Sequence, residues 1–268
     1  MAADGGALDT HATVEFLNFR FTKLSRRLAA DAIARRAARV APFVYVVTPN
    51  VDHVVKRSRQ SVRAKLYDGA WMTLNDSRVL ARLAAVSGIG LPLAPGADLA
   101  HDLFVGGVID PDTPITLIAA EASQADALRR KFFLRDVRCH VPPQNLVGNR
   151  EALEEAAAFA AAQKTPYTFI CVGAPQQEMI AYAMALRGDC VGVGLCLGAA
   201  VDFLTGRQLR APAPLRVLGF EWLFRLLSNP ARLWRRYLVD GPSVFGLWMS
   251  WLFTRPASRA DIASRSEA

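Results

Sequence analysis

Four groups of polar residues, each directly after an apolar segment, carry side chains that could bind a ligand or transfer a proton. They are Thr48 with Asn50, Asn75 with Asp76, Gly173 with Gln177 and Glu178, and Asp202. Asp76 is the candidate for chemistry, because a carboxylate whose pKa is near neutral can deprotonate an attacking hydroxyl. Asp76 also precedes a predicted helix, so the alternative is that its side chain only caps that helix. A similar alternative applies to Asp98, because Gly96-Ala97-Asp98 could simply start a helix.

The other polar groups suit a nucleotide or a sugar. Thr48 and Asn50 offer a donor and an acceptor for a uracil ring or a sugar hydroxyl, although either could instead cap the next helix. Gly173-Ala174-Pro175 lets a ligand approach the backbone, and the helix amides after it could hold a phosphate. The segment is neither a Walker A loop nor a GxGxxG fingerprint. The four histidines show no metal-ligand spacing, so we predict no metal and no other cofactor.

Alternating apolar strands and helices would place these residues at one edge of a sheet. The predicted strands cover residues 14–21, 43–47, 71–74, 115–119, 137–141, 167–172 and 190–197. The predicted helices between them include residues 78–86, 121–133 and 150–163. This alternation predicts an α/β fold with an open, mostly parallel, doubly wound (Rossmann-like) sheet. Ligands bind such sheets at the carboxyl ends of the strands, where all four polar groups fall.

Composition sets the domain organisation. The 268 residues are 52% hydrophobic and 21% charged, which is an ordinary globular composition with room for one α/β domain and an appendage. We predict a flexible N-terminus over residues 1–13, a core over 14–206 and an appendage over 207–268. The N-terminus lacks signal-peptide features, and no run of about 18 apolar residues occurs. Four scattered cysteines without a CxxC pair also suit a reducing compartment, so we expect a cytoplasmic protein.

The appendage is basic and rich in tryptophan. Residues 207–256 contain eight arginines against two acidic residues, and four of the five tryptophans of the chain. Interleaved basic and aromatic residues are typical of helices at a membrane interface. The alternatives are a solvated surface helix and a nucleic-acid site, but no nucleic-acid-binding motif accompanies the patch. We therefore predict an α-helical appendage that associates with an anionic membrane surface, and no nucleic-acid partner.

Taken together, these segments resemble the WecG/TagA/GumM family of bacterial glycosyltransferases (glycosyltransferase family 26). The resemblance covers about residues 14–237. It rests on Thr48-Pro49-Asn50 with Asp76 downstream, on Gly173-Ala174-Pro175-Gln176-Gln177-Glu178, on Arg210-Ala211-Pro212, on Phe220-Glu221-Trp222-Leu223-Phe224-Arg225 and on Pro230-Ala231-Arg232-Leu233-Trp234-Arg235-Arg236-Tyr237. The last three blocks, which form the appendage, are the most specific.

The resemblance implies an inverting, metal-independent transfer of a hexosyl or N-acetylhexosaminyl group in exopolysaccharide or other cell-surface polysaccharide synthesis. The donor would be a UDP-sugar and the acceptor a polyprenyl-diphosphate-linked saccharide, at the inner face of the cytoplasmic membrane. The implied base is Asp76, which lies 28 residues after Thr48. Arginines of the appendage would stabilise the UDP leaving group. The implied substrate-binding residues are Thr48, Asn50, Asp98, Gly173, Gln177, Glu178, Asp202, Arg210, Arg225, Arg232 and Arg235.

The sequence departs from the family pattern in two places. Asn75-Asp76-Ser77 stands where the family usually has Pro-Asp-Gly, and Leu93-Ala94-Pro95-Gly96 lacks an arginine that usually precedes the later aspartate. The missing arginine bears on sugar recognition and leaves the base in place. The rival hypothesis is a membrane-recruited, non-catalytic scaffold with a degenerate transferase fold. Association into a homo-oligomer is compatible with either hypothesis.

Overall fold

The core of the molecule is a six-stranded, all-parallel open sheet. The computed structural model describes residues 10–39, 41–60 and 64–254. The strand order is β4-β3-β8-β7-β5-β6, and every pairing is parallel. The strands are β3 (Val44–Val47), β4 (Met72–Thr73), β5 (Ile115–Ile118), β6 (Val137–His140), β7 (Tyr167–Ile170) and β8 (Val193–Cys196). The predicted doubly wound α/β fold is therefore confirmed.

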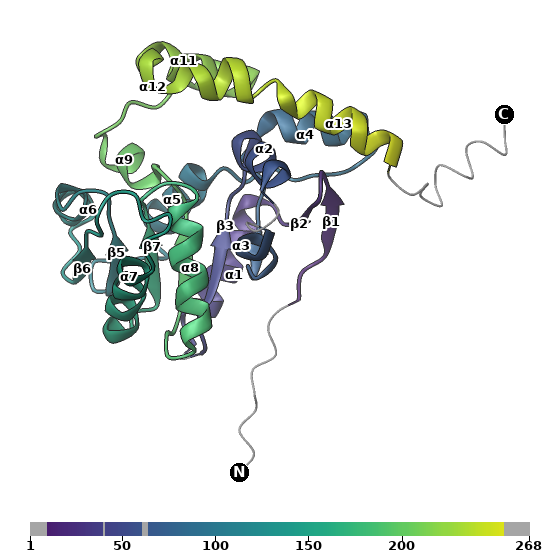
Figure 1. Cartoon of the computed structure of the whole chain (residues 1–268). Coiled ribbons are helices and arrows are strands. Elements are labelled where there is room, and N and C mark those ends of the chain that lie inside the picture. Colours follow the sequence, from purple (N-terminus) through teal and green to yellow (C-terminus); the bar gives the residue numbers. More distant parts are fainter. Residues whose placement is uncertain (1–9, 40, 61–63, 255–268) are drawn as a thin grey trace.

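Helices cover both faces of the sheet (Figure 1). They are α1 (Arg26–Ala37), α2 (Val51–Arg59), α3 (Ala64–Asp68), α4 (Arg78–Val86), α5 (Gly96–Val105), α6 (Ser123–Phe132), α7 (Arg150–Gln163), α8 (Gln176–Arg187) and α9 (Ala200–Thr205). Successive strand residues alternate between two apolar clusters, as in β3, where Val46 faces α1 and α5 whereas Val47 faces α2 and α8. This two-sided burial explains why the central strands are continuous apolar runs.

A β-hairpin replaces the single strand that the sequence predicts over residues 14–21. Its strands β1 (Thr13–Phe16) and β2 (Phe19–Thr22) pair antiparallel. Leu17 and Asn18 form the turn with φ of 50° and 62°, the positive values that a tight hairpin turn requires. The alternating pattern runs through these two residues without glycine, so periodicity alone did not reveal the turn. The hairpin covers the edge strand β4, where Thr22 Oγ1 accepts a 3.1 Å hydrogen bond from Thr73 N.

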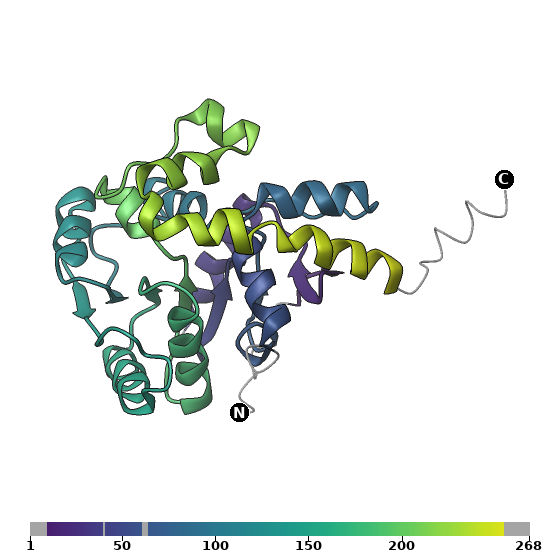
Figure 2. The same ribbon diagram turned by 45° about the horizontal axis from the view of Figure 1, so that its top comes forward.

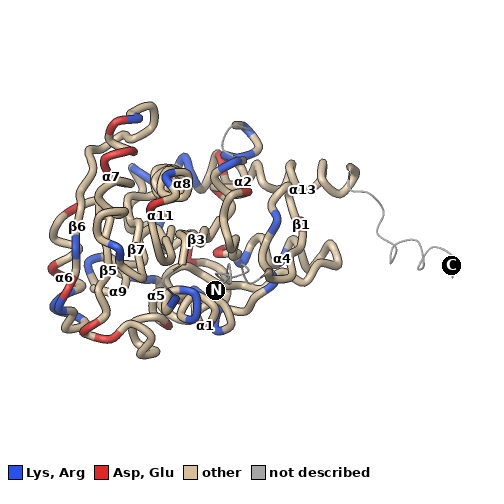
Figure 3. The backbone as a smooth tube through the Cα atoms, turned by 90° about the horizontal axis from the view of Figure 1, so that it is seen from below, with Lys and Arg blue, Asp and Glu red and all other residues tan. Residues whose placement is uncertain are grey.

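The appendage, residues 207–254 in the described part of the chain, crosses the carboxyl edge of the sheet as a series of helices (Figures 1 and 2). They are α10 (Ala213–Leu218), α11 (Glu221–Ser228), α12 (Pro230–Trp234), η2 (Arg235–Asp240) and α13 (Ser243–Thr254). Helix α13 carries no charged residue and is tan along its length in Figure 3. No helix among the described residues has the length and apolarity that a membrane span requires.

Helix α13 packs back onto the core. Val244 is buried, and Trp248 Nε1 donates a 2.8 Å hydrogen bond to Ser87 Oγ at the end of α4. The Trp251 ring meets the Phe16 ring edge-on, with the centroids 5.1 Å apart. Two tryptophans of the appendage thus contact the core. The expected flexibility of residues 1–9, and the final part of the appendage from residue 255, lie outside the described residues.

Candidate active site

Asp76 lies just beyond the carboxyl end of β4 and is not the cap of the following helix. The N-cap of α4 is Ser77, whose Oγ accepts a 3.3 Å hydrogen bond from Leu80 N. The Asp76 carboxylate instead accepts a 3.0 Å bond from Gly96 N and a 3.3 Å bond from Asn50 Nδ2. The capping interpretation of Asp76 is therefore wrong, and the carboxylate is held between two loops at the edge of the sheet.

The loop before α5 supplies one of these contacts. Ala94 N donates a 2.8 Å bond to Asn75 O, and Leu93 pairs with Asn75 in an isolated parallel bridge. These contacts lay the loop along the end of β4 and bring Gly96 N to Asp76. The segment from Leu93 to Gly96, which lacks the arginine that the resemblance leads one to expect, thus lies next to the strand end that carries Asp76.

The surroundings of Asp76 raise the pKa of its carboxyl, which therefore binds a proton more readily than an exposed aspartate does. Burial raises the pKa of the Asp76 carboxyl above its ordinary value, and the nearby Glu221 carboxylate adds to this. The Arg225 guanidinium, the Gly96 amide and the Asn50 amide act in the opposite direction and lower the pKa without cancelling the effect of burial. A raised carboxylate pKa is the direction that a general base needs.

Thr48 and Asn50 have different roles at the carboxyl end of β3. Asn50 caps α2, because its Oδ1 accepts a 3.1 Å bond from Asp52 N, and it also contacts Asp76. The Thr48 hydroxyl donates a 3.2 Å bond to Cys196 O at the end of β8 and does not cap the helix. A Cβ added to Gly96 would come within 2.9 Å of Thr48 Oγ1. Only glycine therefore allows the α5 loop to pack this closely against Thr48.

Gly173, Gln177 and Glu178 lie after β7, where α8 begins. Gly173 has φ of 81°, a value that favours glycine. Gln177 and Glu178 are both buried. Gln177 Oε1 accepts a 2.9 Å bond from Gly198 N after β8, and Gln177 Nε2 donates a 2.7 Å bond to Glu178 Oε1. The polar groups of these two side chains thus already bind each other and the loop after β8.

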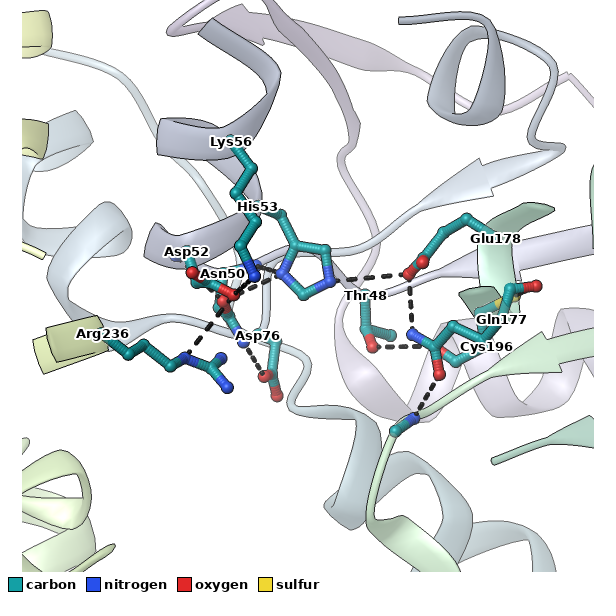
Figure 4. A network of polar contacts seen from close by, with 11 residues as sticks. Thr48, Asn50, Asp52, His53, Lys56, Asp76, Gln177, Glu178, Cys196 and Arg236 are labelled. Atoms are coloured by element: carbon teal, nitrogen blue, oxygen red, sulfur yellow. Dashed lines mark hydrogen bonds and ion pairs between the residues drawn. The ribbon is translucent and has the colours of Figure 1, made fainter. Parts of the chain in front are cut away.

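A histidine that the sequence analysis did not select joins the two sides of the site (Figure 4). His53 Nδ1 lies 2.9 Å from Asn50 Oδ1 and 3.2 Å from Asn50 N, and His53 Nε2 lies 3.5 Å from Glu178 Oε1. The only sequence signal is its spacing, because a residue three positions after an N-cap can return a hydrogen bond to the cap backbone. Its link to Glu178 depends on the pairing of distant strands.

Asp98 and Arg210, both predicted to bind substrate, bind each other. Arg210 Nη1 lies 2.6 Å from Asp98 Oδ1, and Arg26 and Arg216 lie 3.6 and 3.7 Å from the same carboxylate. Burial opposes ionisation of Asp98, but these arginines outweigh it and lower the pKa of the carboxyl. Gly96-Ala97-Asp98 begins α5, so the alternative that this segment starts a helix is confirmed; the N-cap is Pro95, and Asp98 lies in the first turn. This cluster joins the start of the appendage to α1 and α5.

Asp202 also contacts the appendage. Its carboxylate lies 3.2 Å from Arg207 Nε and accepts a 2.9 Å hydrogen bond from Gln124 Nε2. Arg207 in turn lies 2.6 Å from Glu121 Oε2. The Asp202 side chain is thus engaged by protein groups where α9 leads into the appendage.

Three predicted arginines of the appendage differ in their surroundings. Arg225 on α11 lies 3.1 Å from Glu221, stacks on the Phe203 ring at 4.8 Å and acts electrostatically on Asp76. Arg232 and Arg235 are exposed, and they form no ion pair with the described residues. The structure therefore brings Arg225 to the candidate base and leaves Arg232 and Arg235 available to solvent.

The open parallel sheet, with Asp76 at its carboxyl edge and a basic helical segment across that edge, defines a Rossmann-like α/β protein, a class that binds ligands at this edge. The model of the Glycosyl transferase WecG/TagA/CpsF family matches residues 14–258, so the chain belongs to that family. One relative is an N-acetylglucosaminyldiphosphoundecaprenol N-acetyl-beta-D-mannosaminyltransferase of Bacillus spizizenii. It is 39% identical over 85 residues, which cover 31% of this chain and 32% of the relative.

Proposed function

We propose that the chain is an inverting glycosyltransferase that moves a hexosyl or N-acetylhexosaminyl group from a UDP-sugar to a lipid-diphosphate-linked saccharide. Family membership supports the reaction class. The name of the Bacillus relative, which describes mannosaminyl transfer to a diphosphoundecaprenol-linked sugar, supports the kind of acceptor. The product would enter a cell-surface polysaccharide. The observation that carries the proposal is the Asp76 carboxyl, whose pKa is raised by burial at the edge of the sheet.

Asp76 acts as the general base in this proposal. The acceptor hydroxyl oxygen forms a bond to the anomeric carbon of the donor, and its proton passes to the Asp76 carboxylate. The bond between the anomeric carbon and the diphosphate oxygen breaks, and UDP leaves with the electron pair. A single displacement of this kind inverts the anomeric configuration. The Asn50 and Gly96 contacts keep the carboxylate in place while the proton moves.

The donor would lie across the ends of β3 and β8. Thr48 and Asn50 would line the nucleotide-sugar site on the β3 side, and Gly173 and Gln177 on the other. Arg225 acts electrostatically on Asp76 and would offset charge that develops on the leaving diphosphate. Arg232 and Arg235, which are exposed, would reach the diphosphates from the appendage. In this arrangement arginine side chains supply the positive charge, and the reaction needs no metal.

The appendage would hold the enzyme at the inner face of the cytoplasmic membrane. Exposed apolar side chains are spread over α11, α12, η2 and α13, near Arg232 and Arg235. They are Leu223, Leu227, Trp234, Leu238, Val239, Phe245, Met249 and Phe253. Apolar side chains beside basic residues suit binding to anionic lipid. The appendage would then bring the site to its lipid-linked acceptor.

The Asp76→Asn variant tests the chemistry. Because Asn cannot take up the proton, we expect UDP release to fall by about 10²- to 10⁴-fold, while the affinity for the UDP-sugar stays unchanged. UDP release is measured with a panel of UDP-hexoses and a polyprenyl-diphosphate-linked saccharide, and binding by calorimetry. Asp31→Asn, which alters an exposed carboxylate on α1, is the matched control. Full activity of Asp76→Asn rejects the base, and a wild-type chain that binds vesicles without releasing UDP favours the scaffold.

A further inference from the structure

We infer that His53 is a positioning residue of the transfer reaction, which holds Asn50 against the base on one side and Glu178 with Gln177 on the other. The inference rests on the proposed function. It concerns a residue that touches neither Asp76 nor, in our proposal, the substrates. His53 acts through the two side chains that it contacts.

The geometry of the imidazole is that of a bridge between two elements. His53 lies in the first turn of α2, and its side chain is 8% exposed. Its Nδ1 lies 2.9 Å from Asn50 Oδ1 and 3.2 Å from the Asn50 backbone N, and can bond one of them at a time, while Nε2 on the far side of the ring faces Glu178 on α8 at 3.5 Å. One rigid ring thus spans the distance between the end of β3 and the start of α8 (Figure 4).

On the β3 side, the bridge fixes which atom of Asn50 meets the base. Asn50 Oδ1 accepts a 3.1 Å bond from Asp52 N, and it lies 2.9 Å from His53 Nδ1, which donates to it in the form that carries a proton on Nδ1. With the oxygen held there, the Asn50 Nδ2 group must point the other way, where it donates to Asp76 Oδ2. Loss of the imidazole removes one of the two contacts that hold Oδ1. The amide is then freer to rotate away from Asp76.

On the α8 side, the bridge holds a buried carboxylate. The Glu178 side chain is 1% exposed; its Oε1 accepts a hydrogen bond from Gln177 and lies 3.5 Å from His53 Nε2, an ion pair when the imidazole is protonated. A buried carboxylate that loses a partner moves or takes up a proton, because burying an unpaired charge is costly. Any shift of Glu178 passes to Gln177, which holds the Gly198 amide after β8. His53 therefore links the two sides of the proposed donor site.

The alternative is that His53 only caps α2, with an unprotonated Nδ1 that accepts from Asn50 N and therefore does not donate to Asn50 Oδ1. The two roles are separable with His53→Gln. Glutamine at this position retains the capping box, but one amide cannot bond Asn50 and Glu178 at once. Loss of a cap costs stability alone, whereas loss of the bridge changes the hydrogen bond from Asn50 to Asp76.

The pH dependence of activity distinguishes the two roles. The groups acting on Asp76 are the Asn50 amide, the Gly96 amide and Arg225, which lower the pKa of its carboxyl, and Glu221, which raises it. Without the Asn50 bond the pKa of Asp76 rises further, so more base is protonated at a given pH. The acid limb of kcat/KM against pH then moves to higher pH. A purely structural role does not move it.

The experiment compares wild type, His53→Gln, His53→Ala and Asp76→Asn in the UDP-release assay over a range of pH. We expect His53→Gln to melt close to wild type, to lose about 10- to 100-fold in kcat/KM, and to show the shifted acid limb. His101→Gln, which alters an exposed histidine on α5, is the control and should leave activity unchanged. If His53→Ala does not fold, His53→Gln still decides the question.

The outcomes separate the two proposals. An active wild type with an inactive Asp76→Asn supports the proposed function whatever His53 does. If His53→Gln then keeps the wild-type kcat/KM and pH profile, the positioning role is rejected and His53 is only a cap. A wild-type chain that releases no UDP with any donor overturns the proposed function, and with it the role of His53.

Discussion

Burial makes the Asp76 carboxyl less acidic, and the free energy of unfolding therefore depends on pH. The pKa of Asp76 in the folded chain is raised above its value of about 3.9 in an unfolded chain. The folded state therefore binds the proton more tightly than the unfolded state does. The stability gained from this proton is present at low pH and is lost as the pH rises through the folded pKa.

We accordingly expect Asp76→Asn to unfold at higher urea concentration than wild type near pH 7, and this difference to shrink as the pH falls toward about 4. The variant has no carboxylate to ionise in the buried position, so its free energy of unfolding does not fall as the pH rises. Urea titrations at several pH values measure the free energy of unfolding. Asp31→Asn should show no such pH-dependent difference. An advantage of Asp76→Asn that is constant or grows toward low pH would contradict the assignment.

Individual residues could be predicted where a local pattern identifies them. Asp76 and Asn50 stand out because each follows an apolar run and precedes a helix. His53 does not stand out, because its contact with Glu178 exists only when α2 and α8 meet above adjacent strands. The contacts of Asp98 with Arg26, Arg210 and Arg216 could not be predicted either, because they join segments that are distant in the sequence.

At the scale of elements, charged contacts join the appendage to α2. Asp52 lies 2.8 Å from Lys56 Nζ and 3.6 Å from Arg236 Nε on η2, and Arg59 lies 2.5 Å from Asp240. Burial opposes ionisation of Asp52, but Arg236 and Lys56 outweigh it and lower the pKa of the carboxyl. Since Asn50 caps the same helix, docking of η2 occurs next to the candidate site.

We therefore expect Arg236→Gln, combined with Arg59→Gln, to loosen η2 and α13 without disturbing the sheet. Hydrogen exchange should become faster over residues 235–254, by about 2- to 5-fold if the pairs together contribute roughly 0.5–1 kcal/mol, and stay unchanged in β3, β7 and β8. Salt near 0.5 M should produce part of the same effect in wild type, because it screens partly exposed ion pairs.

Arg187→Gln is the matched control, since Arg187 pairs with Glu154 and Asp189 at the other end of α8. It should leave exchange in the appendage as it is. If η2 and α13 of the double variant exchange hydrogen at the same rate as in wild type, apolar packing alone holds these helices.

Helix ends with clear signals were predictable, but strand order was not. The predicted helices over residues 78–86 and 150–163 agree with α4 and α7, whose N-caps Ser77 and Asn149 bond the first turn. The order β4-β3-β8-β7-β5-β6 depends on pairing between distant segments, which no local pattern contains. Segment η2 is a π-helix, which the predicted α-helical appendage did not include. Its residues suit an α-helix equally well, and only the backbone hydrogen-bond pattern distinguishes a π-helix from an α-helix.

For the whole molecule, the basic appendage divides into parts with different uses. Arg207, Arg210 and Arg216 pair with acidic residues of the core, so much of the positive charge near its start is neutralised within the protein. Arg232 and Arg235, further along, are exposed. Charge available to an outside partner is therefore concentrated beyond α11, next to the apolar helix α13. Counting arginines in the sequence could not separate these two uses.

Helix α13 is similarly divided, and this division predicts how the molecule meets a membrane. Val244, Trp248 and Trp251 contact the core, whereas Phe245 and Phe253 are 52% and 83% exposed. Changing Phe245 and Phe253 to Ser should therefore reduce binding to anionic vesicles by about 10-fold or more, since each exposed ring that inserts contributes on the order of 1 kcal/mol. Melting temperature and UDP-sugar affinity should not change, because neither ring packs in the core.

Vesicle co-sedimentation measures this prediction, with Leu186→Ser as the control. Leu186 is 69% exposed on α8, away from the appendage, and its loss should not affect binding. Arg232→Gln with Arg235→Gln should weaken binding in a salt-dependent way, by about 1 kcal/mol for each charge near the lipid surface, whereas the loss from the aromatic variant should be insensitive to salt. If the aromatic variant sediments like wild type, α13 serves the core alone and contact with the membrane is electrostatic.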